Sequence, residues 1–532
     1  MRINEVTIEN FKNLQNFSIS FDENKIKTVL LGQNASGKSN FIEALLLIFK
    51  FLDLSNSTTR NYPPFNYSID YQIRDYNVKI IYKNKKYAIN IDEKEKDETL
   101  KYFFSDESKK LYQPKYVFTY YSGLSNRLKE HFWRHQDDFY RNIIKADFKD
   151  ENIDSLRRLF HVQLVHSYFV MMAYFSFEED ETKSISFLND IFNIKDIESI
   201  LFILKRPFWL NDSRLRKNSN DRFWTSEGLV RTFLDSLWDY SLAPIYHEEN
   251  IQVNFYKKEP QDRLYLYLSS KDKLRKLAKD YKTNTGFFKA LESTYLSGIL
   301  EEVKIKVKKE NVDESITFKE LSEGEQQLLT VLGLLKFTKD EESLILLDEP
   351  DTHLNPLWKW KYFEFLDNVV GKNESTQIIV STHDPLVIGN LTKEEVRIFK
   401  KDEGKVRTVQ PKVDPQGLGV AGILISELFG LPTILDKTTQ ETLNKKRYLQ
   451  GKLIRNKLKP EEIKEYERLK EELERKGFYE EVEDIWFRKY LAEMSKHEIF
   501  QKIEFTEDEQ NFLEEESERV MLKILKEMKD NS

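Results

Sequence analysis

The sequence predicts an α/β fold in which a mixed sheet, covered by helices, is built from two separate segments of the chain. Short apolar strands alternate with helical patterns near the start and again after residue 300, as a helix-covered, largely parallel sheet requires. A long aromatic-rich stretch with mostly helical patterns separates the two segments. The predicted division is a first segment at 1–52, a large, mainly helical insert at 53–299, a second segment at 300–410 and a helical C-terminal appendage at 411–532.

The composition is that of an ordered protein. Of 532 residues, 40% are hydrophobic and 33% charged, which gives room for about three domains. The chain has no cysteine, which excludes disulfides and cysteine-ligated metal clusters. It shows no leader-like apolar segment and no run of 18 apolar residues, so we expect a cytoplasmic protein that does not enter a membrane. A net charge of −7 argues against general coating of nucleic acid but leaves a local basic groove open.

Hydrophobic periodicity places the elements in order along the chain. The first segment has strand patterns at 3–8, 17–21 and 28–31 and a helix from Asn40 onward. The insert has a hairpin at 78–91 turned at Asn84, a strand at 116–121, and helices at 124–139, 155–177 and 227–240. The second segment has strands at 303–307, 316–318, 344–348 and 376–381 and helices at 323–337 and 356–370. Residues 437–528 are helical with a break near Gly477. No heptad persists in the insert, which favours a compact domain over a long coiled coil.

The strongest motif is GQNASGKS at residues 32–39, which matches the Walker A pattern between a predicted strand and a predicted helix. Glycines of such a loop let backbone N–H groups turn toward phosphate oxygens, and the helix N-terminus adds partial positive charge. Lys38 is expected to reach the β- and γ-phosphates of ATP, and Ser39 to bind Mg²⁺. The nucleotide-binding residues predicted here are Gly32, Asn34, Ala35, Ser36, Gly37, Lys38 and Ser39.

A second motif, LILLDEP at residues 344–350, is an apolar strand that delivers two carboxylates at its C-terminal end. Ligands of open α/β sheets gather at that edge. Asp348 is expected to hold Mg²⁺, and Glu349 to polarise the water that attacks the phosphate. An acidic strand end that faces solvent is the alternative, and the preceding Walker A loop disfavours it.

A third motif, LSEGEQQ at residues 321–327, stands directly before a helix. Ser322 and Glu325 have the spacing of a capping box, and Gly324 permits close approach to an anion at the helix N-terminus. Ser322 precedes Asp348 by 26 residues (348 − 322). In this position the motif resembles the signature sequence of ABC-type ATPases, although Glu323 replaces its usual first glycine. The resemblance implies that Ser322, Gly324 and Glu325 contact nucleotide.

Two loops complete the pattern. STHD at residues 381–384 follows a strand and resembles the switch-histidine loop of the same class, which implies that His383 contacts the γ-phosphate. DTHLNP at 351–356 resembles the D-loop of RecF-like and OLD-like ATPases. The segment FTYYSG at 118–123 stands where a Q-loop belongs but carries no glutamine.

The motif order resembles the split ABC-type ATPase head of the SMC/RecF/OLD superfamily and covers residues 1 to about 410 in two pieces. IENFKNL at 8–14 resembles its opening strand, with Lys12 where relatives place a basic residue near the nucleotide. The resemblance implies a homodimer that sandwiches ATP between two copies, with the signature of one protomer completing the site of the other. It leaves a higher oligomer open.

The segment GLGVAGILISELFGL at 417–431 resembles the region that follows the head in PtuA-type ATPases of Septu and retron-linked anti-phage systems. This resemblance implies an ATPase that controls a separate HNH-type nuclease, with the helices beyond 437 as its docking surface. A retron reverse transcriptase or its nucleic acid is a further candidate partner. No D-x-D motif follows residue 410, and His497 is the only histidine after His383, so we see no nuclease site in the chain itself.

Two other function classes stay open. One is a DNA repair or clamp ATPase that acts on DNA directly. The cationic and aromatic residues of 205–224 provide a candidate surface for it, although a stretch of this composition is more often a solvated loop with buried aromatic side chains. The other is an ATP-gated interaction module with little turnover. His131 and His135 are four residues apart, but Phe132 stands where a zinc-protease helix has glutamate, which disfavours a metal site.

Overall fold

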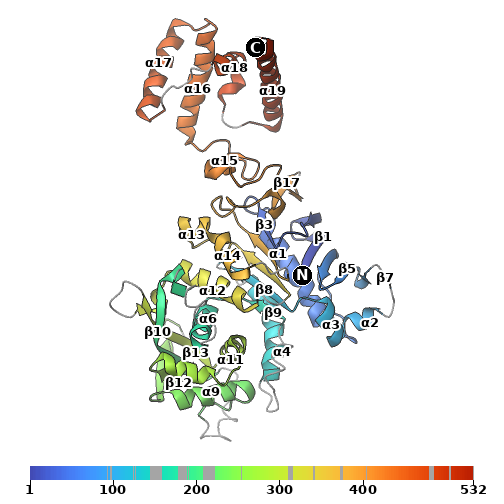
Figure 1. Cartoon of the computed structure of the whole chain (residues 1–532), viewed down its shortest axis with the longest axis vertical. Coiled ribbons are helices and arrows are strands. Elements are labelled where there is room, and N and C mark those ends of the chain that lie inside the picture. The colour runs from blue at the N-terminus through green and yellow to red at the C-terminus, as the bar shows by residue number, and fades with distance from the viewer. Residues whose placement is uncertain are drawn as a thin grey trace. The chain divides into compact units, whose positions relative to one another are not determined.

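The computed structural model describes residues 1–530 except 93, 96–98, 124, 126, 144–157, 178–187, 190, 208–221, 253, 310–315, 339–341, 372–374, 403, 479–484 and 503–504. The chain divides into two compact units, Met1–Gly417 and Leu418–Ser532. In the described part of the chain, the first unit contains three sheets with helices around them, and the second unit is helical (Figure 1). The predicted α/β fold, with helix-covered sheets and a helical C-terminal part, is confirmed.

A seven-stranded sheet occupies the centre of the first unit, in the order β18-β17-β3-β16-β15-β8-β9. Its strands are β3 (Lys27–Leu31), β8 (Tyr116–Tyr121), β9 (Leu159–His161), β15 (Ser343–Asp348), β16 (Gln377–Ser381), β17 (Val396–Asp402) and β18 (Lys405–Val409). All neighbours are parallel except the pair β17–β18. Asp348 lies opposite Ser381, and Ser381 lies opposite Leu30. The C-terminal ends of β15, β16 and β3 therefore meet at one edge of the sheet.

Helices cover both faces of this sheet, which explains why residues 344–347 of β15 are all apolar. Leu344 shares a core with α1 (Lys38–Leu54). Ile345, the next residue, lines a small apolar cavity with residues of α12 (Glu323–Thr338). Successive side chains of a strand point to opposite faces, so a strand that is buried on both faces has no position left for a polar residue.

A six-stranded antiparallel sheet contains the first two strands of the chain and the predicted hairpin. Its strands are β1 (Arg2–Phe11), β2 (Leu14–Ser20), β4 (Tyr67–Ile73), β5 (Tyr76–Lys83), β6 (Lys86–Ile91) and β7 (Lys94–Glu95). Asn84 and Lys85, which connect β5 to β6, both have positive φ, 51° and 60°. Two consecutive left-handed residues are the geometry of a tight hairpin turn, so the predicted hairpin at 78–91 is confirmed.

A five-stranded antiparallel sheet has the order β11-β12-β10-β13-β14. Its strands are β10 (Ile194–Lys205), β11 (Ile245–Gln252), β12 (Lys258–Leu268), β13 (Leu300–Lys309) and β14 (Ile316–Thr317). Helices α9 (Gly228–Tyr240), α10 (Lys271–Ala278) and α11 (Asn284–Leu296) pack against β12, β10 and β13, and α11 also packs on α6 (Val165–Ser176) (Figure 1).

Residues 53–299 contain strands as well as helices. In place of the helix predicted at 124–139, residues 129–132 form a 3₁₀ helix and residues 133–143 an α-helix. Helix α9 agrees with the prediction at 227–240, and β8 with the strand at 116–121. The helix predicted at 155–177 is wrong at its start, because residues 159–161 form β9 and the helix begins at Val165. Strands β10, β11 and β12 were not predicted. β10 is buried on parts of both faces, so it lacks the alternation by which a half-buried strand is recognised.

The remaining elements of the first unit connect these sheets. They are α2 (Thr99–Phe103), α3 (Asp106–Tyr112), η1 (Lys129–Phe132), α4 (Trp133–Ile143), η3 (Phe318–Glu320), α13 (Pro356–Trp360), α14 (Tyr362–Val370) and η4 (Lys393–Glu395), where η marks a 3₁₀ helix.

The second unit consists of helices around small apolar clusters. They are α15 (Gly419–Ile425), α16 (Lys437–Ile454), α17 (Pro460–Arg475), α18 (Ile485–Met494), η5 (Glu498–Gln501) and α19 (Glu507–Asp530). Helix α17 ends just before Gly477, where the sequence predicted a break.

Among the described residues, we find no helix with the length and apolar character that a membrane span demands.

Candidate functional site

The Walker A residues form a tight loop between β3 and the start of α1. Gly32 has φ 149°, and a Cβ at this position would lie 2.6 Å from the carbonyl oxygen of Phe399. Only glycine fits such an approach. Gly37 precedes α1 and has no side chain that could cap the helix, so the N–H groups of the first turn are left to an outside acceptor.

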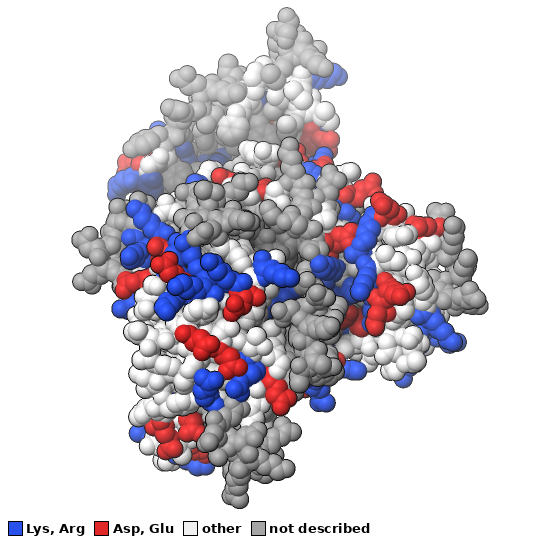
Figure 2. Space-filling view, turned by 60° about the horizontal axis from the view of Figure 1, so that its bottom comes forward, with Lys and Arg blue, Asp and Glu red and all other residues white. Residues whose placement is uncertain are grey.

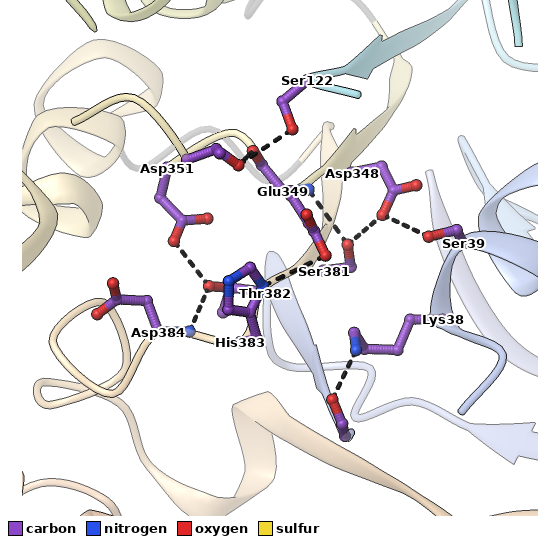
Figure 3. A network of polar contacts seen from close by, with 12 residues as sticks. Lys38, Ser39, Ser122, Asp348, Glu349, Asp351, Ser381, Thr382, His383 and Asp384 are labelled. Carbon is purple, nitrogen blue, oxygen red and sulfur yellow. Dashed lines mark hydrogen bonds and ion pairs between the residues drawn. The ribbon is translucent and has the colours of Figure 1, made fainter. Parts of the chain in front are cut away.

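Lys38 extends back across this loop. Its Nζ donates to the carbonyl oxygens of Gly32 and Gln33, at 2.6 and 3.3 Å (Figure 3). Burial lowers the pKa of Lys38, and the nearby carboxylates of Glu349 and Asp348 oppose this shift. An ammonium group that is partly desolvated and held by neutral carbonyls interacts strongly with an anion.

Ser39 and Asp348 bring the two head segments together. Ser39 Oγ donates to Asp348 Oδ1 at 3.1 Å, and Ser381 Oγ donates to the same oxygen (Figure 3). Burial raises the pKa of Asp348, while the hydrogen bonds from Ser381 and Ser39 act in the opposite direction. A hydroxyl and a carboxylate at this spacing are the hard oxygen ligands that Mg²⁺ prefers.

These residues fit a magnesium-bound nucleotide on two independent grounds. Ser39 and Asp348 supply the oxygen donors. Within the described part of the chain, Ser36 Oγ is buried in the loop without a hydrogen-bond partner, and buried polar atoms normally have one. A ligand with acceptor oxygens in this loop would satisfy it.

Glu349 leaves the strand in a left-handed conformation, with φ 53°. Its N–H donates to the carbonyl oxygen of Ser381 at 3.0 Å and lies 3.2 Å from Ser381 Oγ. A non-glycine residue in this region is strained and persists only where its surroundings fix it. The turn directs the Glu349 side chain toward His383, whose Nδ1 lies 3.3 Å from Glu349 Oε1 (Figure 3). Both side chains keep access to solvent.

The D-loop is tied to the loop that follows β16. Thr382 Oγ1 donates to Asp351 Oδ2 at 2.9 Å, and burial raises the pKa of Asp351 to about 6. On the other side, Ser122 Oγ lies 3.1 Å from Thr352 Oγ1 (Figure 3). The segment after β8, where the sequence showed no Q-loop glutamine, thus contacts the D-loop through a serine.

The signature residues form the start of α12, and Gly324 lies against the D-loop of the same chain. Ser322 Oγ accepts from the N–H of Glu325 at 3.2 Å, and the Ser322 N–H donates to Glu325 Oε2 at 2.7 Å, which forms the capping box. A Cβ on Gly324 would lie 2.5 Å from the carbonyl oxygen of His353. Glu325 also receives a hydrogen bond of 2.8 Å from Lys309. Within one chain Ser322 and Glu325 cap α12 and Gly324 packs it against the D-loop, and the contact of these residues with nucleotide stays a prediction.

Lys12 and the two histidines of the insert bind carboxylates of α1. Lys12 Nζ contacts both oxygens of Glu43, at 2.7 and 2.6 Å, and its contact with nucleotide stays a prediction. His131 Nε2 lies 3.2 Å from Glu43 Oε1, and His135 Nε2 lies 3.0 Å from Asp53 Oδ2. Sequence reasoning missed Glu43 and Asp53 because a carboxylate inside an apolar helix stretch carries no motif.

The fold and this site define a nucleotide-binding ATPase domain. A family model described as an AAA ATPase domain matches residues 1–388, and the chain belongs to this family.

Among curated proteins, the chain is similar to the Septu protein PtuA of Bacillus mycoides (strain KBAB4), with 27% identity over 242 residues, 41% of this chain and 33% of that protein. It is also similar to the Retron Vc95 probable ATPase of Vibrio cholerae serotype O1 biovar El Tor, with 27% identity over 115 residues, 20% of this chain and 22% of that protein. The chain thus matches about a third or less of the length of these relatives. The resemblance to PtuA-type ATPases expected from the sequence is confirmed.

Among solved structures, the SMC head domain from Thermotoga maritima matches 78% of this chain and 100% of its own, with 14% identity and a TM-score of 0.30. An agreement this loose adds nothing to the assignment.

Proposed function

We propose that the chain binds ATP with Mg²⁺ at the Walker A loop and hydrolyses it as a homodimer, in order to control a separate effector nuclease in anti-phage defence. The observation that carries the ATPase part is the convergence of Lys38, Ser39, Asp348 and Glu349 at one sheet edge. Membership of an ATPase-domain family supports the same reaction.

In this mechanism the backbone N–H groups of residues 32–39 and the Lys38 ammonium bind the phosphates. Ser39 and Asp348 would hold Mg²⁺, which supplies charge neutralisation when it is bound. Glu349 accepts a proton from the attacking water, and its position next to His383 places the base beside the residue expected to contact the γ-phosphate. The left-handed turn at Glu349 keeps the base out of the strand and at the sheet edge.

The signature is proposed to act in trans. Ser322, Gly324 and Glu325 lie at the start of α12, where a helix N-terminus offers donors to an anion. In the proposed homodimer they complete the nucleotide site of the second copy. The contacts of Gly324 with His353 and of Gln327 with Pro350 hold this helix end beside the loop that follows Asp348.

The second unit is proposed to bind the nuclease. A groove of about 1190 Å³ lies between its helices, with Ile425, Met494 and Leu522 among its lining residues. Met521 and Leu522 of α19 are 54% and 61% exposed, and an exposed apolar helix face is a common docking surface for a partner protein. The resemblance of residues 417–431 to PtuA-type ATPases indicates an HNH-type nuclease as the partner.

The test is copurification of the chain with its nuclease, combined with a nucleotide assay. Lys38→Ala should abolish ATP binding, whereas deletion of 437–532 should abolish nuclease association and leave ATP binding intact. The double variant Met521→Glu with Leu522→Glu changes only exposed side chains of α19 and should also lose the nuclease, while Glu515→Ala on the same helix should retain it. Nuclease association that survives both the deletion and the double variant would remove the docking assignment.

Direct action on DNA is the second candidate function. Lys and Arg side chains gather in one area of the face in Figure 2, with acidic side chains among them. The cationic residues Arg214, Arg216 and Lys217 of the candidate surface at 205–224 lie outside the described residues. ATPase activity that DNA stimulates, and that neutralising these three residues abolishes, would support this function. The third candidate function, an ATP-gated interaction module, would be supported if the chain bound a partner only with ATP and did not hydrolyse the ATP.

A further inference from the structure

Glu43 lies one turn into α1, is buried, and gathers three basic side chains. Lys12 Nζ donates to its two oxygens, His131 Nε2 lies 3.2 Å from Oε1, and Arg127 Nε donates to Oε2. Burial alone would raise the pKa of Glu43, but the hydrogen bonds from His131, Lys12 and Arg127 outweigh it and lower the pKa to about 2. Because Lys12 and Arg127 together exceed the one negative charge of Glu43, the cluster is net positive.

The three basic residues come from separate parts of the first unit. Lys12 lies between β1 and β2, Arg127 lies in the segment after β8, and His131 lies in η1, which leads directly into α4. Glu43 therefore connects the helix of the Walker A loop to the antiparallel sheet and to the insert.

Arg127 also reaches the phosphate loop. Its Nη2 donates to Asn40 Oδ1, and Asn40 directly follows Ser39. Asn40 Nδ2 donates to Asn13 Oδ1 at 2.5 Å, and Asn13 Nδ2 donates to the carbonyl oxygen of Ala35 at 3.1 Å. One chain of hydrogen bonds thus runs from the Walker A loop to the guanidinium of Arg127.

The charge of Arg127 also reaches the second head segment. Burial raises the pKa of Asp348, and the positive charge of Arg127 is among the groups that oppose this shift. At the other end of the same segment, the Ser122 N–H donates to the carbonyl oxygen of Asp348 at 3.2 Å. After β8, Ser122 is therefore bonded to β15 and Arg127 to α1.

We propose that Arg127 is a positioning residue that couples nucleotide in the Walker A loop to the insert helix α4. The inference rests on the proposed ATP site. A guanidinium is a planar fork that suits phosphates and carboxylates alike. When the negatively charged phosphates of a nucleotide bind next to Ser39, they change the balance between the Arg127–Asn40 hydrogen bond and the Arg127–Glu43 ion pair. His131, which contacts the same carboxylate, transmits the change to α4.

The experiment measures amide hydrogen exchange with and without Mg²⁺ and adenylyl imidodiphosphate, an ATP analogue that is not hydrolysed. In the wild type, residues 32–39 and residues 133–143 should both change their protection. In Arg127→Ala, residues 32–39 should still respond and the response of 133–143 should be lost. Arg127→Lys keeps the charge without the fork and should retain part of the response. Arg134→Ala removes a neighbouring arginine that bonds to Asn61 instead, and it should respond as the wild type does.

Turnover gives a second measurement. Arg127→Ala should lower kcat for ATP by about 10- to 100-fold and leave KM within about threefold, because positioning residues act on the reacting geometry more than on ground-state binding. If the wild type shows no protection of 32–39, the proposed nucleotide site itself fails. If 32–39 respond while 133–143 respond alike in the wild type and in Arg127→Ala, the coupling alone is overturned.

Discussion

Ser39 and Asp348 stand 309 positions apart in the chain, yet their side chains share a hydrogen bond of 3.1 Å. The contact exists because α1 starts at the end of β3 and because β15 and β3 flank β16 in one parallel sheet. The Walker A loop and the end of β15 therefore lie together within one chain, whereas the contact of Ser322 with the nucleotide of a second copy stays a prediction. The roles of the individual residues in ATP chemistry remain predictions, which the following experiments check.

Replacing the proposed base should separate binding from hydrolysis. Glu349→Gln keeps the size of the side chain but removes the proton acceptor, so kcat should fall by about 10² or more. Affinity for ATP should stay unchanged, as measured with a fluorescent nucleotide. Glu364→Gln alters an exposed glutamate of α14 and is the matched control. A kcat for Glu349→Gln that equals the control would exclude Glu349 as the base.

Complementation between two inactive variants tests the sandwich. Lys38→Ala destroys the Walker A contact, and Ser322→Arg destroys the signature contact, so neither variant should hydrolyse ATP alone. A mixed dimer contains one site in which both are intact if the signature acts in trans. The mixture should then regain activity in a steady-state assay. Hydrolysis no faster than that of either variant would show that the trans arrangement is wrong.

Gly324 tests the packing between α12 and the D-loop. An alanine in a helix is normally favoured over glycine by about 1 kcal/mol, but here the added methyl would lie 2.5 Å from the backbone oxygen of His353. We expect Gly324→Ala to destabilise the protein by about 1–3 kcal/mol. The control is Gly286→Ala, whose methyl meets its first neighbour at 3.3 Å. Thermal unfolding curves of both variants measure the difference, and equal midpoints would contradict the steric argument.

Asp53 tests the electrostatics of the contact between α1 and α4. Burial alone would raise its pKa, but the hydrogen bond from His135 and the charges of Arg158, His135 and Lys109 lower it to about 2. Because the folded-state pKa lies below the value near 3.8 of an unfolded chain, the charged form stabilises the fold above about pH 4. This stabilisation decreases as the pH falls from about 4 to about 2, where both states become protonated.

Asp53→Asn should therefore lower the free energy of unfolding by about 2 kcal/mol at pH 7. The difference from the wild type should shrink below pH 4. Asp137→Asn, which removes an exposed pair with Arg141, should change stability by less than about 0.5 kcal/mol. Urea denaturation at pH 7 and pH 3 measures both effects, and a difference for Asp53→Asn that does not depend on pH would refute this assignment.

The parts of the structure that were predicted from sequence are those in which one local signal suffices. The strand at 344–348, the helix that starts at Glu323 and the turn at Asn84 each combine a hydrophobic period with a characteristic residue at the boundary. The order of the motifs then indicated that both head segments share one site.

Other parts depend on contacts that the sequence does not display. The strand β10 is buried on parts of both faces, so its pattern did not distinguish it from a helix. Glu43 belongs to no motif, and only the fold shows that Lys12, Arg127 and His131 surround it. The resemblance predicted that Lys12 lies near the nucleotide, whereas in the structure its ammonium group forms an ion pair with the Glu43 carboxylate.

The close packing of α12 on the D-loop has a mechanical consequence. Gln327 Nε2 donates to the carbonyl oxygen of Pro350 at 2.6 Å, and Gly324 lies against His353. These two contacts connect the start of α12 to the loop that directly follows Asp348 and Glu349. In the proposed dimer, a shift of the D-loop at one nucleotide would therefore also shift the helix end that faces the second nucleotide.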